Sequence, residues 1–224
     1  MRRFVRENGL SLFFFAIFAI TLVGLSFAGR NAYNAVQAEH GESRVSWWSY
    51  VTSTDFGGSV MENWQSEFLQ FSLYIVSTVW LLQRGSSESK SPGDMGTTSN
   101  QSQLVGGYAK PSSPAWARAA GLRRFLYANS LLLAMTFCFF GSWLCQSVNG
   151  WRAYNHQQLE HKEPTITWGE YWANADFWDR SLQNWQSEFL AIGSIAVFTI
   201  YLRQRGSPES KPVGAPHDAT GITN

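Results

Sequence analysis

The stretch Leu10–Ala28, LSLFFFAIFAITLVGLSFA, decides the fold class of this chain. It carries no charged residue, and a helix that crosses a bilayer needs about 20 consecutive, mainly apolar residues. Three further apolar blocks follow at about residues 64–82, 125–148 and 185–202. We therefore predict an all-α integral membrane protein with four transmembrane helices.

The average composition hides this segregation. Mean hydropathy is only −0.18 and the formal net charge is +1, because Ser, Gly, Asn, Gln and charged residues fill the segments between the apolar blocks. The 11 Trp and 8 Tyr favour a membrane protein, since their amphipathic rings prefer the headgroup boundary. The near-zero charge, without a basic stripe interleaved with aromatic residues, argues against nucleic acid as a partner.

The chain matches itself without gaps at an offset of 121 residues, which sets Arg124 on Arg3. The strongest matches are NWQSEFL, at 63–69 and 184–190, and QRGSxESK, at 83–90 and 204–211. An identity of this length that contains Trp predicts duplication of one structural unit. Each copy holds two apolar blocks, so the chain returns to its starting side, and we predict two parallel tandem helix-loop-helix repeats.

The predicted organisation follows from the repeat. The first repeat spans 1–90, with membrane helices at about 10–28 and 64–82, and the second spans 118–211, with membrane helices at about 125–148 and 185–202. Between and after them lie segments rich in small and polar residues without apolar periodicity, which we predict to be a flexible cytoplasmic linker and a flexible cytoplasmic tail, at 91–117 and 212–224.

Lys and Arg near the ends of the blocks predict the orientation. One side collects Arg2, Arg3, Arg6, Arg84, Lys90, Lys110, Arg118, Arg123, Arg124, Arg203, Arg205 and Lys211; the other holds only Arg30, Arg44, Arg152, Lys162 and Arg180. Both termini should therefore be cytoplasmic. Residues 1–28 also fit a signal peptide ending in a small-x-small site, but the apolar run exceeds the usual length, and its duplicate at 125–148 must be retained.

The two exterior loops, about 30–63 and 151–184, are rich in aromatic residues. Asn31–His40 and Arg152–His161 contain no Gly or Pro, so they can prolong the preceding helix beyond the membrane. The spacing of Thr167 and Glu170 predicts a capping box and a short helix lying flat at the interface. Candidate interface aromatics in and beside these loops are Trp47, Trp48, Trp64, Trp168, Trp172, Trp178 and Trp185.

The ends of the returning helices also carry signals. Asp55 and Asp176 have the residue type and position of N-caps. Gly85 and Gly206 suit the left-handed residue at a helix C-terminus.

Glu67 and Glu188, within the two NWQSEFL segments, are the first candidate site. Each carboxylate should lie about one turn inside the outer membrane boundary, where an ionisable group is costly. One reading is that polar neighbours hold each carboxylate and fix helix register; the other is a role in binding a ligand, ion or proton. The candidate intramembrane polar residues are Glu67, Glu188, Asn63, Asn184, Gln65, Gln186, Gln70 and Tyr74.

Helical spacing predicts a polar track in the first copy only. Asn63, Glu67, Gln70, Tyr74 and Ser77 fall on one face of a helix. The equivalent positions in the second copy end in Ala191, Ile195 and Phe198, so a continuous symmetric conduit is disfavoured.

A weak metal candidate lies on the exterior side: Glu39 with His40, and Glu160 with His161. Imidazole and carboxylate suit several divalent ions, but solvated residues at a helix end give the same pattern. No HEXXH or CXXC spacing, Gly-rich phosphate loop or GxSxG occurs, so we predict no cofactor and no enzymatic activity. The two cysteines, Cys138 and Cys145, share one apolar block and are predicted to be packing residues.

The paired NWQSEF segments, the repeated QRGSxESK and the tail KPVGAPHDATG resemble an uncharacterised family of bacterial membrane proteins known only as a domain of unknown function. The resemblance covers nearly the whole chain and departs mainly in the linker, around 91–115. It implies a bacterial inner membrane and the same four-helix layout, and it implies no activity.

Three function classes remain open. The first is a multi-pass, non-enzymatic structural, interaction or stress-related accessory protein whose aromatic loops dock on lipid or a partner. The second is a small oligomeric transporter or channel that uses Glu67 and Glu188, and the third is a metal-dependent enzyme at the exterior face. The expected partners are the lipid bilayer and either a second copy of the chain or another membrane protein.

Overall fold

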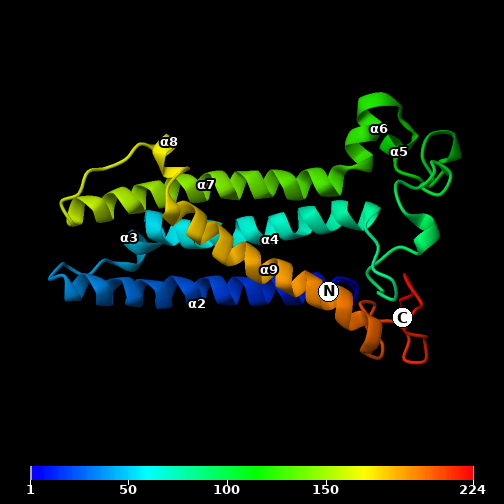
Figure 1. Ribbon diagram of the computed structural model, residues 1–224, viewed down its shortest axis with the longest axis horizontal. Helices are drawn as coiled ribbons and strands as arrows, with labels where there is room; N and C mark the ends of the chain where they lie inside the picture. Colours follow the sequence, from blue (N-terminus) through cyan, green and yellow to red (C-terminus); the bar gives the residue numbers. More distant parts are fainter. Residues whose placement is uncertain (1, 224) are drawn as a thin grey trace. The chain divides into compact units, whose positions relative to one another are not determined.

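The computed structural model describes residues 2–223, and every regular element in that range is helical, which confirms the all-α prediction (Figure 1). Four helices are long: α2 (Gly9–Glu39), α4 (Thr54–Trp80), α7 (Ser130–Glu160) and α9 (Ala175–Tyr201). The short ones are α1 (Arg2–Glu7), α3 (Trp47–Val51), α5 (Ala115–Arg118), α6 (Gly121–Ala128) and α8 (Trp168–Tyr171), with two 3-10 turns, η1 (Pro92–Asp94) and η2 (Gly106–Tyr108).

Of the helices within 2–223, α2 and α7 are long and apolar enough to cross a membrane, with mean hydropathies of 2.4 and 1.6 in their most apolar windows. These two helices indicate membrane association. The first halves of α4 and α9 carry acidic and amide side chains, and the apolar half that follows Glu67 or Glu188 is shorter than the about 20 residues a span requires. Crossing of the membrane by α4 and α9 stays a prediction.

The helix ends confirm some local predictions. Helices α2 and α7 continue to Glu39 and Glu160, so both extend well beyond their apolar blocks, as the sequence predicts. Helix α8 opens on the predicted capping box: the Thr167 backbone N–H donates to Glu170 Oε2 at 2.7 Å, and the Glu170 N–H donates to Thr167 Oγ1 at 3.3 Å.

The predicted N-caps of the returning helices are wrong. Asn174 caps α9 by accepting from the Asp176 N–H at 2.9 Å, and Ser53, just before α4, accepts from the Phe56 N–H at 3.3 Å. Asp55 and Asp176 therefore lie inside the first turn, where a carboxylate still favours the positive end of the helix dipole.

The predicted glycines do not end the returning helices either. Gly85 and Gly206 have the expected positive φ, at 87° and 84°, but they lie in the turns that follow, since α4 ends at Trp80 and α9 at Tyr201.

The chain divides into two compact units that do not coincide with the two sequence copies. The first unit comprises Met1–Met61 and Cys145–Tyr171, and the second comprises Glu62–Leu144 and Trp172–Asn224. The first unit thus holds both short loop helices, α3 and α8, and the second holds most of α4 and all of α9.

In the first unit, equivalent asparagines fasten both loops to the preceding long helix. The Asn34 side chain accepts from the Val45 N–H at 2.7 Å and donates to the Val45 carbonyl at 3.2 Å. Asn155 makes the same two hydrogen bonds with Ile166, at 2.9 and 2.8 Å. These two pairs of residues stand 121 positions apart.

Aromatic residues of the first unit repeat the same equivalence. Trp47 Nε1 donates to Ser26 Oγ at 3.0 Å, and Trp168 Nε1 donates to Ser147 Oγ at 3.2 Å. Each short helix therefore lies against the long helix that precedes it, and an indole nitrogen anchors it there.

The long helices leave space for the tyrosines of α3 and α8. A Cβ at Gly29 would overlap the Tyr50 hydroxyl, and a Cβ at Gly150 would overlap the Tyr171 hydroxyl. Glycine is needed at both positions because the phenol approaches the helix backbone directly.

In the second unit, the turns that follow α4 and α9 are built alike. The Gln83 N–H donates to Ser89 Oγ at 2.9 Å, and the Gln204 N–H donates to Ser210 Oγ at 2.9 Å. The lysine that ends each QRGSxESK segment, Lys90 or Lys211, then donates through Nζ to a backbone carbonyl six residues later, at 2.7 and 2.9 Å.

The tail, predicted to be flexible, makes several hydrogen bonds in the second unit. The Gly85 N–H donates to Thr220 Oγ1 at 2.8 Å, and the Gly221 N–H donates to the Ser86 carbonyl at 3.0 Å. Lys211 is fully buried and donates to the carbonyls of Gly85, Pro216, His217 and Ala219. The tail was predicted to be flexible because its sequence lacks apolar periodicity. Apolar periodicity gives no information about hydrogen bonds of this kind.

Candidate functional site

The two candidate glutamates meet at one side chain. The carboxamide of Gln70, oriented with its nitrogen toward the acceptors, donates to Glu188 Oε2 at 2.7 Å and to Glu67 Oε2 at 3.3 Å. Glu67 and Gln70 lie one turn apart on α4, and Glu188 lies on α9. The structure therefore brings together the equivalent carboxylates of the two copies, through an amide present in the first copy only.

The rest of the predicted polar track does not continue from this bridge. Tyr74 Oη donates to Glu88 Oε2 at 2.7 Å, so its hydroxyl is engaged by the turn after α4. The second-copy amides largely stay on their own helix: Asn184 Nδ2 donates to the Arg180 carbonyl at 2.9 Å, and Gln186 Nε2 to the Gln183 carbonyl at 3.2 Å.

Gln65 is the best buried of the predicted polar residues. It is fully buried, its Oε1 accepts from Trp185 Nε1 on α9 at 2.7 Å, and its Nε2 donates to the Glu62 carbonyl at 3.1 Å. The equivalent Gln186 is exposed. The same residue type thus has a different environment in each copy.

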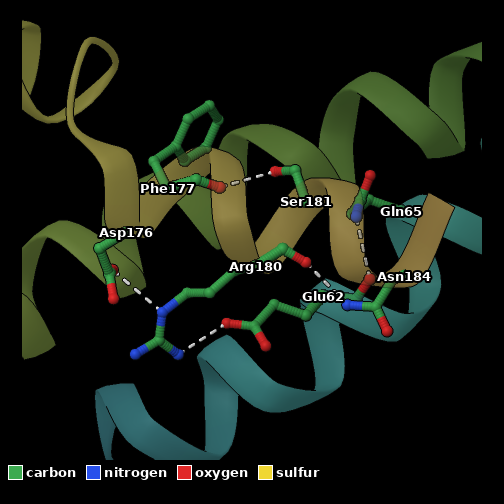
Figure 2. Close-up of polar contacts among 7 residues, drawn as sticks. All are labelled: Glu62, Gln65, Asp176, Phe177, Arg180, Ser181 and Asn184. Atoms are coloured by element: carbon green, nitrogen blue, oxygen red, sulfur yellow. Dashed lines mark hydrogen bonds and ion pairs between the residues drawn. The ribbon is translucent and has the colours of Figure 1, made fainter. Parts of the chain in front are cut away.

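An ion cluster near the start of α9, which sequence reasoning missed, lies beside Gln65 (Figure 2). Arg180 Nη1 donates to Glu62 Oε1 on α4 at 3.0 Å, and Arg180 Nε donates to Asp176 Oδ2, one turn earlier on α9, at 3.0 Å. One guanidinium therefore links α4 to α9 and also neutralises a carboxylate of its own helix.

Burial and neighbouring charges shift the pKa values of Glu62 and Arg180 in opposite directions. Both residues lie outside the predicted membrane spans. Burial raises the pKa of Glu62, and the neighbouring Arg180 only partly offsets that rise. Burial also disfavours the charged form of Arg180, but Glu62 and Asp176 outweigh it and raise its pKa. Arg180 is thus permanently charged, and Glu62 is a carboxylate whose ionisation depends on it.

One sequence signal could have found the cluster. The position equivalent to Arg180 in the first copy is Ser59, and the position equivalent to Glu62 in the second copy is Gln183. Each copy thus carries one member of an oppositely charged pair where the other copy has a neutral residue.

The predicted interface aromatics fall into two groups. Trp47 and Trp48 of α3 contact edge to face with ring centroids 4.8 Å apart, and Trp48 remains 72% exposed. Trp64 and Trp168 keep more than a third of their surface exposed.

In the second unit, three of the predicted aromatics gather around Trp143 of α7. The ring centroids of Trp172, Trp178 and Trp185 lie 5.1, 6.1 and 5.9 Å from that of Trp143. These three side chains form one aromatic cluster with Trp143, and their place at a membrane interface stays a prediction.

The candidate histidine and glutamate residues near the ends of α2 and α7 make local contacts. His40 Nδ1 lies 3.1 Å from the Val36 carbonyl, and Glu160 lies 3.2 Å from His156 Nδ1 on the same helix. Among residues 2–223, no group of three or more His, Cys, Asp and Glu side chains is arranged to hold a metal ion. Within this range, the weak metal candidates Glu39, His40, Glu160 and His161 form no such group.

Comparison with known proteins identifies the family of the chain and gives no further match. A family model described as a domain of unknown function (DUF6766) matches residues 1–222, which confirms the resemblance seen in the sequence. No curated protein and no solved structure matches the chain.

Proposed function

Because the chain belongs to the DUF6766 family, whose description names no activity, we propose a function from the structure: a non-enzymatic structural or interaction module of the bacterial inner membrane. In this proposal all four long helices cross the bilayer and both termini are cytoplasmic. The two exterior loops carry the docking surface, and a stress-related accessory role is one form that such a module can take.

The observation that carries this proposal is the environment of Trp48. The helix that presents it, α3, is fixed at its start by Ser46, whose side chain accepts from the Ser49 N–H at 3.1 Å. It is also fixed by the hydrogen bond from Trp47 to Ser26 on α2. Trp48 is nevertheless 72% exposed. A large amphipathic ring held rigidly outside its own fold loses little entropy when it docks, and it suits the headgroup boundary or an apolar partner surface.

The proposed topology has independent support. Most Lys and Arg residues lie on the side of the termini, and the matched contacts at an offset of 121 fit two parallel copies that arose by duplication. The polar side chains of α4 meet partners on α9, which lowers the cost of burying them in a bilayer.

Site-directed fluorescence in vesicles tests the docking role of Trp48. In a background with Cys138→Ala and Cys145→Ala, Trp48→Cys carries an environment-sensitive fluorophore, and Glu42→Cys in the same exposed loop serves as the matched control. We expect a blue shift and strong quenching by headgroup-level spin labels at position 48 only. Equal quenching at both positions would rule out docking of Trp48 on lipid.

A second function, proton or cation transport, is favoured by one observation: the shared hydrogen bonds from Gln70 hold the carboxylates of Glu67 and Glu188 close together. Such a pair could bind a proton or a small cation in transit. Proteoliposomes with an internal pH dye test this function. Flux that falls in Glu67→Gln and Glu188→Gln but not in exposed Glu163→Gln would favour it, whereas wild-type flux equal to that of empty vesicles would end it.

A further inference from the structure

A pocket of about 960 Å³ lies within the second unit, where the C-terminal end of α4, the linker and the start of α7 meet. Val79 of α4 and Ser130, the first residue of α7, both belong to the lining. Its lining mixes hydroxyl and amide side chains with apolar ones such as Val105 and Phe125. None of the function classes above uses this pocket.

The charged residues in the lining are both cations, Lys90 and Arg124. In the part of the chain that the structure describes, neither pairs with a carboxylate. Both side chains are half-buried, whereas the neighbouring Arg123 is exposed and outside the lining. The pocket thus has a net positive charge that the protein itself does not neutralise.

The linker fixes the position of both cations. Lys90 Nζ donates to the Gly96 carbonyl at 2.7 Å, which leaves two further N–H donors on the ammonium. A Cβ at Gly106 would lie 2.9 Å from Arg124 Nη1, so the linker backbone packs directly against the guanidinium. Gly106 has a φ of 63°, a conformation that other residues rarely adopt.

The surroundings of the pocket indicate which anion fits. Its lining reaches Ser130, where the candidate membrane span α7 begins. Phe125, also in the lining, remains 58% exposed, and Leu122 of the same short helix α6 is exposed as well. A ligand seated here would meet two cations and also apolar side chains next to a candidate membrane span.

We propose that this pocket binds the phosphate group of an anionic membrane lipid. Guanidinium and ammonium groups together suit phosphate oxygens, and basic pockets at the ends of membrane helices bind anionic headgroups. The site requires only that α7 cross the membrane, so it does not depend on Trp48 or on transport through Glu67 and Glu188.

Native mass spectrometry of the full chain in neutral detergent, titrated with phosphatidylglycerol, tests the proposal. Wild type should retain one lipid, and Arg124→Gln should bind it with an apparent affinity about fivefold weaker. Arg123→Gln, which removes the adjacent exposed charge, should bind like wild type. Arg124→Lys should keep part of the affinity, which would show that charge, and not a folding defect, is responsible.

Three outcomes would overturn the proposal. Equal losses in Arg123→Gln and Arg124→Gln would reduce the effect to general surface charge. Equal retention of neutral phosphatidylcholine by wild type and Arg124→Gln, with no preference for phosphatidylglycerol, would show that no anion site exists. Calorimetric binding of inorganic phosphate that depends on Arg124 but does not compete with lipid would assign the pocket to a soluble phosphate compound.

Discussion

Equivalent residues of the two copies make matching contacts in the loops of the first unit, but differing ones where α4 meets α9 in the second. In the first unit, equivalent residues make equivalent contacts: Asn34 and Asn155 each bind the backbone of their loop, and Trp47 and Trp168 each donate to a serine of the preceding helix. At the contact of α4 with α9 in the second unit, the copies differ. The loop architecture is therefore common to both copies, and the Glu62–Arg180 and Gln65–Trp185 contacts lie where the copies diverge.

The Glu62–Arg180 pair is the clearest divergence and should give the largest effect. Arg180→Ser restores the residue that the first copy has at Ser59 and leaves Glu62 without its cation. Breaking a buried pair costs about 3–5 kcal/mol. Because the Arg180 side chain is 37% exposed and that of Glu62 15%, we expect about 2 kcal/mol after solvent screening, measured as a lower melting temperature in detergent.

A second substitution and a pH series sharpen this test. Glu62→Gln in the Arg180→Ser background copies the neutral pair Ser59 and Gln183, and should recover most of the lost stability. The pKa of Glu62 is raised by burial, so its contribution is present below the usual glutamate value and is lost as pH rises through the folded-state pKa. The defect of Arg180→Ser should therefore shrink in acid, and a defect independent of pH would contradict the ionic explanation.

The matched glycines of the first unit, Gly29 and Gly150, test whether the two copies share one loop architecture. Gly29→Ala and Gly150→Ala should each destabilise the protein by about 1–2 kcal/mol, because a new Cβ must displace a tyrosine hydroxyl. Gly24→Ala, which meets no atom within 4 Å, is the control and should be neutral or slightly stabilising. Markedly unequal costs at positions 29 and 150 would argue against equivalent loop architecture.

Glu170 gives the smallest expected effect and marks a difference between α8 and α3. Its hydrogen bonds from the backbone N–H and hydroxyl of Thr167 lower its pKa, whereas the equivalent residue in α3 is Ser49. The stability this carboxylate contributes is present above the usual glutamate pKa and is lost as pH falls through the lowered value. The melting temperature of Glu170→Gln should match wild type in strong acid and fall slightly below it near neutral pH. A difference that persists in acid would assign the effect to packing.

Local sequence signals predicted the features that depend on neighbouring residues. The all-helical class, the continuation of α2 and α7 to Glu39 and Glu160, and the capping box at Thr167 all follow from composition and spacing within a few residues. The N-caps at Asp55 and Asp176 were wrong because Ser53 and Asn174 offered competing side-chain acceptors close by.

The candidate site was only partly predictable, because it depends on which faces of two distant helices meet. Glu67 and Glu188 stood out from their duplication, but nothing local indicated that Gln70 would bridge them. Glu62 and Arg180 lie 118 residues apart, and each looks like an ordinary solvated charge in its own segment. A comparison of the two copies position by position would have indicated the pair, because Ser59 and Gln183 are the neutral equivalents of Arg180 and Glu62.

The hydrogen bonds between the first QRGSxESK turn and the tail have a consequence for biosynthesis. Gly85 and Ser86 bind Thr220 and Gly221, so the turn after α4 receives these partners only once Thr220 and Gly221 have left the ribosome. The first copy can therefore be synthesised in full well before this turn is complete. A ribosome that stalls before Thr220 would leave a chain with all its long helices and an unfinished turn between its two copies.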